Sequence, residues 1–378
     1  MESKSIRIYG LDLMRAIAII MVLVSHSSYI FPENNNVLSG LLQLVGFQGV
    51  EIFFVLSGFL IGSILLKIIN STSFSISDIT YFWIRRWFRT LPLYFLILLL
   101  NIGVGYYIGY VMPNNLWVYF IFLQNFASEH LLFFPESWSL SIEEYAYILS
   151  PIVLFLGNIF FKNKQKMFLW CTIFLILIFT LTKLIYYKHH IDVPTSLQFW
   201  NLNLKALVIY RLDAIYYGFI LAYIFHYKRC FFKEFRYKLF LLGIVLLAVL
   251  NLVFPIGLVF KTYPFYLNVL YLPLNTIAIA LFLPFLYYME KPHRIIQSIV
   301  LNISVYSYAM YLLHYTFILY VMQLTFPFEG LKLYEKMICV LVYLSITYIL
   351  SSIVYKYYEK PITNLRDKNF FKDLVKSN

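Results

Sequence analysis

The sequence has 378 residues, of which 61% are hydrophobic and only 13% are charged, and its mean hydropathy is +0.76. These values exclude an ordinary soluble globular domain and predict an all-α, polytopic membrane protein. The net charge of +12 is explained by basic loops on one side of a membrane, so no nucleic-acid partner is expected.

Apolar stretches long enough to cross a bilayer, about 20 residues each, occur ten times along the chain. The first lacks the small-residue cleavage site of a secretory signal, so we expect a retained helix. The run LWVYFIFLQNF at 116–126 is too short to cross and predicts an interfacial or re-entrant segment. The predicted spans are 11–31, 44–66, 90–111, 138–161, 167–187, 206–227, 239–259, 267–289, 301–325 and 337–357.

Basic residues favour one orientation of these spans. With the N-terminus in the cytoplasm, 22 of the 30 Lys and Arg residues fall in cytoplasmic segments. Six fall in outer loops, namely Lys183, Lys188, Lys205, Lys261, Lys332 and Lys336. The positive-inside rule therefore predicts that both termini are cytoplasmic. We expect one transmembrane domain over 1–378 that ends in a short basic tail at 358–378, with no extracytoplasmic domain after the last span.

The three cysteines, Cys171, Cys230 and Cys339, stand far apart in or beside apolar runs. Since no paired spacing indicates a disulfide or a metal site, we interpret them as packing residues and expect no metal. Functional residues are better sought among ionisable side chains within the spans, because each costs about 2.5 to 3.5 kcal/mol to insert.

The first span contains Asp12, Arg15 and His26. Eleven residues at about 100° each place Arg15 and His26 on nearly one face of a helix, about 16 Å apart along its axis. Arg15 then lies near the cytoplasm and His26 in the outer half. An Arg15 paired with Asp12 at the interface, and a His26 bonded to a neighbouring serine or carbonyl, are structural alternatives.

The second span contains GVEIFFVLSGFLIG, with Glu51 at about the depth of His26. A carboxylate there could accept the ring N–H of the histidine and raise its basicity. The small residues Gly49, Ser57, Gly58 and Gly62 are explained by close helix packing.

A basic run, YFWIRRWFRTLP, precedes the predicted third span and contains Arg85, Arg86 and Arg89 between Trp83 and Trp87. Interfacial anchoring accounts for such a run. The alternative is an anion site, in which guanidinium groups bind phosphates and a tryptophan stacks on a planar base. A phosphorylated nucleotide would fit this site.

The later spans add further ionisable groups. ESWSLSIEEYAY opens the fourth span and places Glu136, Glu143 and Glu144 near the outer surface, where solvation explains at least Glu136 and Glu144. Arg211 and Asp213 lie near the outer end of the sixth span, and His314 lies at mid-membrane in the ninth. The outer half thus collects His26, Glu51, Glu143, Arg211 and Asp213.

Together these segments resemble the acyltransferase-3 family of bacterial integral membrane proteins, which O-acylate cell-surface sugars. The resemblance spans nearly the whole chain and rests on R-x10-H at 15–26, GVEIFFVLSGFLI at 49–61, RRWFRTLP at 85–92, WSLSIEEYAYILSP at 138–151, RLDAIYYGFILAY at 211–223, ISVYSYAMYLLHY at 303–315 and YYEKPI at 357–362. One departure is Glu51, which stands where many relatives carry aspartate.

The resemblance implies roles for several residues. Arg15 and His26 would be required for activity, Arg86 and Arg89 would bind the acyl-CoA donor with Arg85 beside them, and Glu143 would be the functional glutamate of the W-S-L segment. We predict Glu51 as a further catalytic residue. We also predict acceptor contacts from Trp138, Ser139, Arg211 and Asp213. Larger members of the family append an SGNH esterase-like domain, whereas this chain is similar to stand-alone members.

The resulting hypothesis is an enzyme of the bacterial plasma (inner) membrane that moves an acyl group, acetyl by preference, from acetyl-CoA or another acyl-CoA to a hydroxyl of an extracytoplasmic saccharide or lipid-linked glycan. His26 would act as general base or would be acylated transiently. The alternatives are a transporter or flippase of a lipid-linked saccharide and a non-catalytic scaffold subunit of a polysaccharide synthase.

Overall fold

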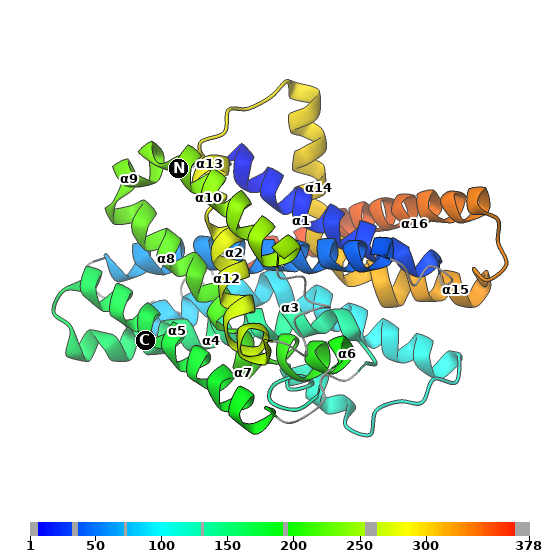
Figure 1. The fold of residues 1–378 in the computed structure, drawn as a ribbon, viewed down its shortest axis with the longest axis horizontal. Helices are drawn as coiled ribbons and strands as arrows, with labels where there is room; N and C mark the ends of the chain where they lie inside the picture. The colour runs from blue at the N-terminus through cyan, green and yellow to red at the C-terminus, as the bar shows by residue number, and fades with distance from the viewer. Residues whose placement is uncertain are drawn as a thin grey trace.

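Long helices build the whole structure, a computed structural model that describes residues 7–31, 37–71, 74–129, 132–191, 196–253 and 263–366. No strand occurs within these ranges, which confirms the all-α prediction. Several of the long helices, among them α1, α2 and α16, run from left to right across Figure 1. The protein is an all-α polytopic membrane protein.

The first half of the chain supplies α1 (Tyr9–His26), η1 (Ser27–Ile30), α2 (Val37–Ile69), α3 (Ile76–Tyr107), η2 (Leu116–Ile121), η3 (Pro135–Ser137), α4 (Trp138–Phe160) and α5 (Lys164–His189). The middle contains α6 (Leu197–Trp200), η4 (Asn201–Lys205), α7 (Val208–Arg211), α8 (Asp213–Tyr227), α9 (Arg229–Glu234), α10 (Arg236–Ala248) and η5 (Val249–Val253). The last third contains η6 (Tyr266–Leu270), α12 (Tyr271–Ala280), α13 (Leu283–Tyr287), α14 (Arg294–Leu313), η7 (His314–Tyr320), α15 (Val321–Thr325), α16 (Leu333–Val354), η8 (Tyr355–Glu359) and α17 (Lys360–Leu365).

Nine helical stretches within the described ranges are long and apolar enough to cross a membrane, against ten predicted spans. The difference concerns the predicted span 239–259. Its inner part is formed by α10 and η5 up to Val253, and the rest of that prediction lies outside the described residues. The short run 116–126 forms the 3₁₀ helix η2 and a following turn, as its length indicated.

The third helix begins well before its predicted start at residue 90. Ser75 caps α3, because its hydroxyl accepts from the backbone N–H of Asp78 at 3.3 Å while the Asp78 carboxylate accepts from the Ser75 N–H at 2.9 Å. The helix then continues through Pro92 to Tyr107. The three arginines predicted to precede the helix are therefore within it.

Small residues allow α2 and α8 to pack closely, as the sequence predicted. A Cβ atom on Gly58 would lie 1.9 Å from the Ile215 carbonyl oxygen, and one on Gly218 would lie 2.4 Å from that of Val55. Ser57 differs from the adjacent Gly58, because the Ser57 hydroxyl donates a hydrogen bond to the Glu143 carboxylate at 3.3 Å. Ser57 is therefore part of a polar site and not a simple packing residue.

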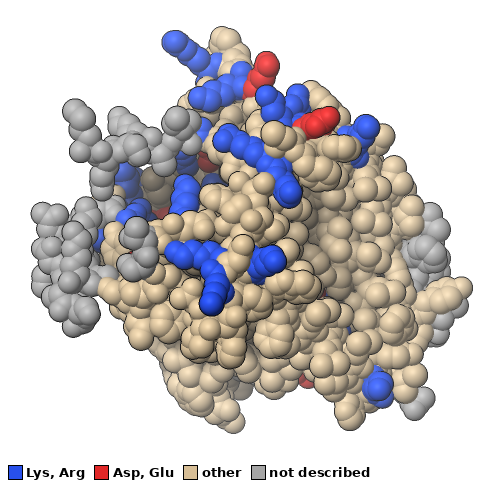
Figure 2. All heavy atoms as spheres, turned by 90° about the vertical axis from the view of Figure 1, so that its left-hand side faces the viewer, with Lys and Arg blue, Asp and Glu red and all other residues tan. Residues whose placement is uncertain are grey.

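Lys and Arg side chains gather on the face that looks left in Figure 1, the side of α9, as Figure 2 shows. This face corresponds to the side that the positive-inside rule assigns to the cytoplasm. The assignment of Lys183 to an outer loop was wrong. Lys183 lies within α5, is fully buried and forms an ion pair with Asp213.

Candidate functional site

A cavity lies among α1, α2, α3, α4 and α14. Its apolar wall comes mainly from α2, through Val50, Phe53, Phe54, Leu56, Leu60 and Ile61. Its polar lining consists of Arg15, Ser57, Arg86, Arg89, Thr90, Ser139, Glu143, Ser307, Tyr308 and Tyr311. The cavity therefore combines three guanidinium groups with an apolar wall.

The cavity wall brings together Arg86 of α3 and Glu143 of α4, which the sequence had placed on opposite sides of the membrane. Arg86 Nη2 lies 3.8 Å from a Glu143 carboxylate oxygen. Tyr147 donates to the same carboxylate and accepts a hydrogen bond from Arg86. Because α3 starts early and carries its arginines inside the bundle, Arg86 reaches the depth of Glu143.

Arg89 is exposed and lines the same cavity. Among the described residues, no hydrogen bond or ion pair engages its guanidinium group, which leaves that group available to a phosphate. Arg85 differs, because it donates to the Tyr81 hydroxyl at 2.8 Å and does not line the cavity. Trp83 and Trp87 stack on each other, with 6.0 Å between their ring centroids.

Arg15 reaches the cavity from α1. Its Nη1 atom lies 3.5 Å from an Asp12 carboxylate oxygen and donates to the Ser304 hydroxyl at 3.2 Å, and Ser304 in turn donates to Asp12 at 2.7 Å. The Asp12 pairing expected from the sequence is thus formed, and α14 contributes a third member. These contacts hold the guanidinium group in one orientation at the cavity wall.

His26 is the last residue of α1 and is partly exposed. Its Nδ1 atom lies 2.8 Å from the Val22 carbonyl oxygen. A carbonyl can only accept, so Nδ1 carries the proton and the neutral ring has a free lone pair on Nε2. The ring centroid lies 4.7 Å from that of His314 and 5.0 Å from that of Tyr315.

His314, in the ninth predicted span, is a second imidazole and has no predicted role. It is fully buried and begins the π-helical turn η7, and π-turns recur at functional sites. Its Nδ1 atom lies 2.7 Å from the Tyr311 carbonyl oxygen, while Nε2 has no partner among the described residues. His26 and His314 therefore present the same tautomer.

Tyr311 connects this imidazole pair to the cavity. Its side chain lines the cavity, its hydroxyl bonds to the Ser139 hydroxyl at 2.7 Å, and its ring centroid lies 5.6 Å from that of His314. Ser139 thus lies on the cavity wall, as its predicted role requires. The imidazole pair lies immediately behind Tyr311.

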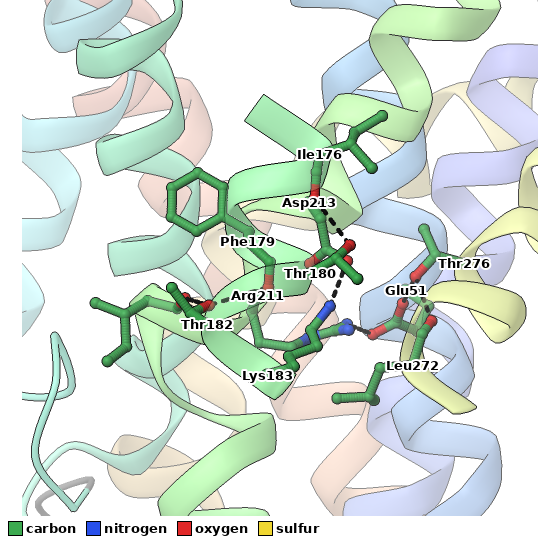
Figure 3. Close-up of polar contacts among 11 residues, drawn as sticks. Glu51, Ile176, Phe179, Thr180, Thr182, Lys183, Arg211, Asp213, Leu272 and Thr276 are labelled. Carbon is green, nitrogen blue, oxygen red and sulfur yellow. Dashed lines mark hydrogen bonds and ion pairs between the residues drawn. The ribbon is translucent and has the colours of Figure 1, made fainter. Parts of the chain in front are cut away.

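The expected hydrogen bond between Glu51 and His26 is not formed. Glu51 is fully buried, pairs with Arg211 and accepts from the Thr276 hydroxyl at 2.7 Å (Figure 3). Asp213 pairs with Lys183 beside it. Two acidic and two basic side chains from α2, α5, α7 and α8 thus neutralise one another inside the bundle.

This buried network changes the interpretation of Arg211 and Asp213. Both were predicted to contact the acceptor, yet both are fully buried and paired within the protein. In this conformation neither side chain reaches a ligand. A buried charge without its partner is strongly destabilising, so the four side chains hold the helices around the site in place.

Trp138 contacts a lysine, whereas Glu136 and Glu144 accept hydrogen bonds from threonine side chains. The Trp138 ring lies under the Lys205 ammonium group, 5.4 Å from ring centroid to Nζ. Glu136 accepts from the Thr316 hydroxyl at 2.7 Å, and Glu144 accepts from the Thr90 hydroxyl at 2.7 Å. Glu136 and Glu144 are therefore buried structural acceptors, and the expectation that they are solvated was wrong.

Sequence reasoning missed several members of the site. Tyr147 stands four residues after Glu143 on one helix face, so the spacing predicts the contact between these two side chains. Lys183 is visible in the sequence as a charged residue inside an apolar run. Tyr311 has no comparable signal, because its place depends on how α14 packs. Among the described residues, no group of three or more His, Cys, Asp or Glu side chains is arranged to hold a metal ion.

Comparison with known proteins adds independent information. A family model described as an acyltransferase domain matches residues 8–361. O-acetyltransferase OatA of Staphylococcus aureus (strain NCTC 8325 / PS 47) is 30% identical over 392 aligned residues, which cover 96% of this chain and 57% of OatA. YrhL of Bacillus subtilis (strain 168), which bears the name "Putative peptidoglycan O-acetyltransferase", is 33% identical over 177 residues, 42% of this chain and 25% of YrhL.

A protein of S. aureus (strain COL) named "Putative O-acetyltransferase" is 34% identical over 173 residues, 42% of this chain and 26% of that protein. The chain thus spans about a quarter of two of these relatives and little more than half of the third. No solved structure matches the chain.

Proposed function

The chain belongs to the family defined by the acyltransferase domain, and from this premise we propose that it transfers an acyl group from cytoplasmic acyl-CoA to a hydroxyl of an extracytoplasmic saccharide. The acyl group we propose is acetyl, in line with the names of the relatives. The site of action is the bacterial plasma membrane. The acceptor is a cell-surface glycan, as peptidoglycan is in the name of YrhL.

The observation that carries this proposal is the cavity with an unpaired arginine at one end and imidazoles behind the other. The phosphates of the donor would bind Arg89 and Arg86, with Arg15 deeper in the cavity. The pantetheine arm is long and flexible and suits the apolar wall of α2. Its thioester would then reach Ser139 and Tyr311, next to the imidazole pair.

His26 is the proposed general base. Its free Nε2 lone pair would take the proton of the saccharide hydroxyl as the oxygen attacks the thioester carbonyl. The new C–O bond forms, the C–S bond breaks, and the proton passes from His26 to the departing CoA thiolate. A transient acyl-histidine on the same Nε2 atom is the two-step variant.

Two further residues act around this reaction. Glu143 would orient Arg86 and Tyr147 on the cavity wall, since it contacts both. Arg15 would place a positive charge near the thioester end of the donor, held there by Asp12 and Ser304. We assign Glu51 to the buried network and not to proton transfer, because Arg211 and Thr276 occupy its carboxylate.

The test is acyl transfer by the purified full chain in liposomes. [¹⁴C]acetyl-CoA is supplied together with cell-wall and exopolysaccharide fractions from a deletion strain. We expect base-labile label on one fraction, and a loss of at least about 100-fold with His26→Gln, which removes a general base. His189→Gln, an exposed histidine of α5, is the matched control.

Other outcomes would contradict the proposal. A flippase would move unmodified saccharide across the membrane without label. A scaffold subunit would tolerate replacement of Arg15 and His26 with little effect on the glycan. Normal acetylation by a correctly inserted His26→Gln variant would refute the assignment of the base.

A further inference from the structure

Lys205 is a cation at the outer end of the bundle that no step above uses. Its Nζ atom lies 5.3 Å from the ring centroid of Phe47 and 5.4 Å from that of Trp138. Such cation–π contacts favour the charged form but provide no counter-ion. Among the described residues, no carboxylate forms an ion pair with Lys205.

The neighbouring charges cannot neutralise Lys205, because they already neutralise one another. Glu51 is engaged by Arg211, and Asp213 by Lys183. This leaves one net positive charge at Lys205. Burial and the Arg211 charge, opposed only partly by the Glu51 charge, lower the pKa of Lys205 to about 8. The ammonium group is therefore partly desolvated and lacks an anionic partner.

Hydrogen bonds hold the backbone that carries Lys205. Lys205 ends the π-turn η4, where the next backbone N–H, that of Ala206, donates to the Asn201 carbonyl at 3.0 Å. The side chain of Asn125 in turn donates to the Ala206 carbonyl, and the Asn125 carbonyl accepts from the Val208 N–H at 3.0 Å. The backbone at Lys205 is thus held in place before any ligand binds.

Lys205 also lies beside the cavity. The Trp138 ring that it contacts packs against Phe54 of the cavity wall, with 5.9 Å between ring centroids, and Trp138 is followed by Ser139 of the same wall. The Lys205 charge acts on the His26 ring, and the Lys205 side chain is only half-buried. A ligand that reaches His26 from the outer side would therefore come within range of the ammonium group. An anionic group on that ligand would supply the missing counter-ion.

We propose that Lys205 binds a carboxylate of the acceptor, so that the substrate is an acidic saccharide. This inference rests on the proposed function. A carboxylate fits better than a phosphate, because a single ammonium group, which acts as a point charge, matches a single negative charge. A phosphate carries up to two charges, and the clustered guanidinium groups at the other end of the cavity match it better. Lys205 is then a specificity-determining residue and takes no proton in the reaction.

The experiment measures binding and transfer in parallel on one pair of ligands. The ligands are a hexasaccharide of alternating glucuronate and N-acetylglucosamine and the same hexasaccharide with its carboxyl groups reduced to alcohols. The full chain is embedded in phosphatidylcholine nanodiscs. We expect the acidic form to bind at least about 10-fold more tightly, a difference that corresponds to about 1.4 kcal/mol.

Variants at position 205 make the result specific. Lys205→Met should bind both ligands equally and leave the affinity for the reduced form unchanged, whereas Lys205→Arg should retain the preference. Lys188→Met, which removes an exposed lysine from the last turn of α5, should behave as wild type.

Equal binding of the two ligands by the wild type, binding of neither, or an unchanged preference in Lys205→Met would overturn the inference. Displacement of the acidic hexasaccharide by millimolar inorganic phosphate would likewise overturn it in favour of a phosphate site. Failure of transfer is a separate result. If the acidic form binds through Lys205 but receives no acetyl group from acetyl-CoA, the proposed function fails while the carboxylate site stands.

Discussion

Individual side chains at the two ends of the cavity define the proposed chemistry. At one end Arg89 has no partner among the described residues, and behind the other end His26 presents a free Nε2 lone pair. The sequence identified both residues, because each is an ionisable group in or beside an apolar run. It could not show that His314 lies beside His26, since residues 288 positions apart meet only through packing.

Arg89 should govern affinity for the donor. Arg89→Ala removes a phosphate contact that is made equally in the ground and transition states, so we expect KM for acetyl-CoA to rise about 10-fold with little change in kcat. Arg85→Ala should raise KM less, because Arg85 bonds to Tyr81 and lies outside the cavity lining. Lys67→Ala, an exposed lysine of α2, is the control. A smaller effect from Arg89→Ala than from Arg85→Ala would contradict this assignment.

The preference for an acidic ligand should depend on pH. Lys205 is charged below its pKa of about 8 and neutral above it. The affinity ratio of the acidic to the reduced hexasaccharide should therefore be high at pH 6.5 and should fall between pH 8 and 9.5. His26, Glu51 and Arg211 also face Lys205, and taking the ratio cancels any effect that they have on both ligands. A ratio that is constant across this range would show that Lys205 is not the recognising group.

At the scale of elements, charge pairs between helices position the site. Glu51 joins α2 to Arg211 of α7 and Thr276 of α12, and Asp213 joins α8 to Lys183 of α5. Breaking a buried pair costs about 3 to 5 kcal/mol, whereas replacing both partners by apolar residues of similar size is often nearly neutral. The pairing therefore predicts a distinctive pattern of stability.

Glu51→Leu alone should lower the melting temperature in detergent markedly, because it leaves Arg211 unpaired. The double variant Glu51→Leu with Arg211→Met should recover much of the loss. Thermal unfolding of the single and double variants, followed by tryptophan fluorescence, measures the coupling between the two sites. Strictly additive losses in the double variant would show that the pair contributes nothing.

Elements were predicted from the sequence to different degrees. The first helix was predicted closely, because its apolar run is continuous and ends at a cluster of polar residues. The start of α3 was missed, since arginines lower the hydropathy of a run, although the Ser75–Asp78 capping box was visible in the sequence. The pairing of Glu51 with Arg211, 160 positions apart, has no local signal. Tertiary packing alone brings these two residues together.

At the scale of the whole molecule, the arrangement would separate the proposed donor from the proposed acceptor. Basic side chains gather on one face (Figure 2), the arginine-lined cavity lies among the helices, and His26 and Lys205 lie towards the opposite end of α1 and α2. Because α1 carries Arg15 and His26 on one face about 16 Å apart, a single helix spans the path that the acyl group would follow. The central claim is therefore that transfer crosses the membrane.

Sided vesicles test this claim most directly. The full chain is inserted with its basic face outward, [¹⁴C]acetyl-CoA is added outside, and the acceptor glycan is sealed inside. We predict label on the enclosed glycan and none when Arg89→Ala is combined with His26→Gln. Label that forms only when donor and acceptor share one compartment would contradict the account.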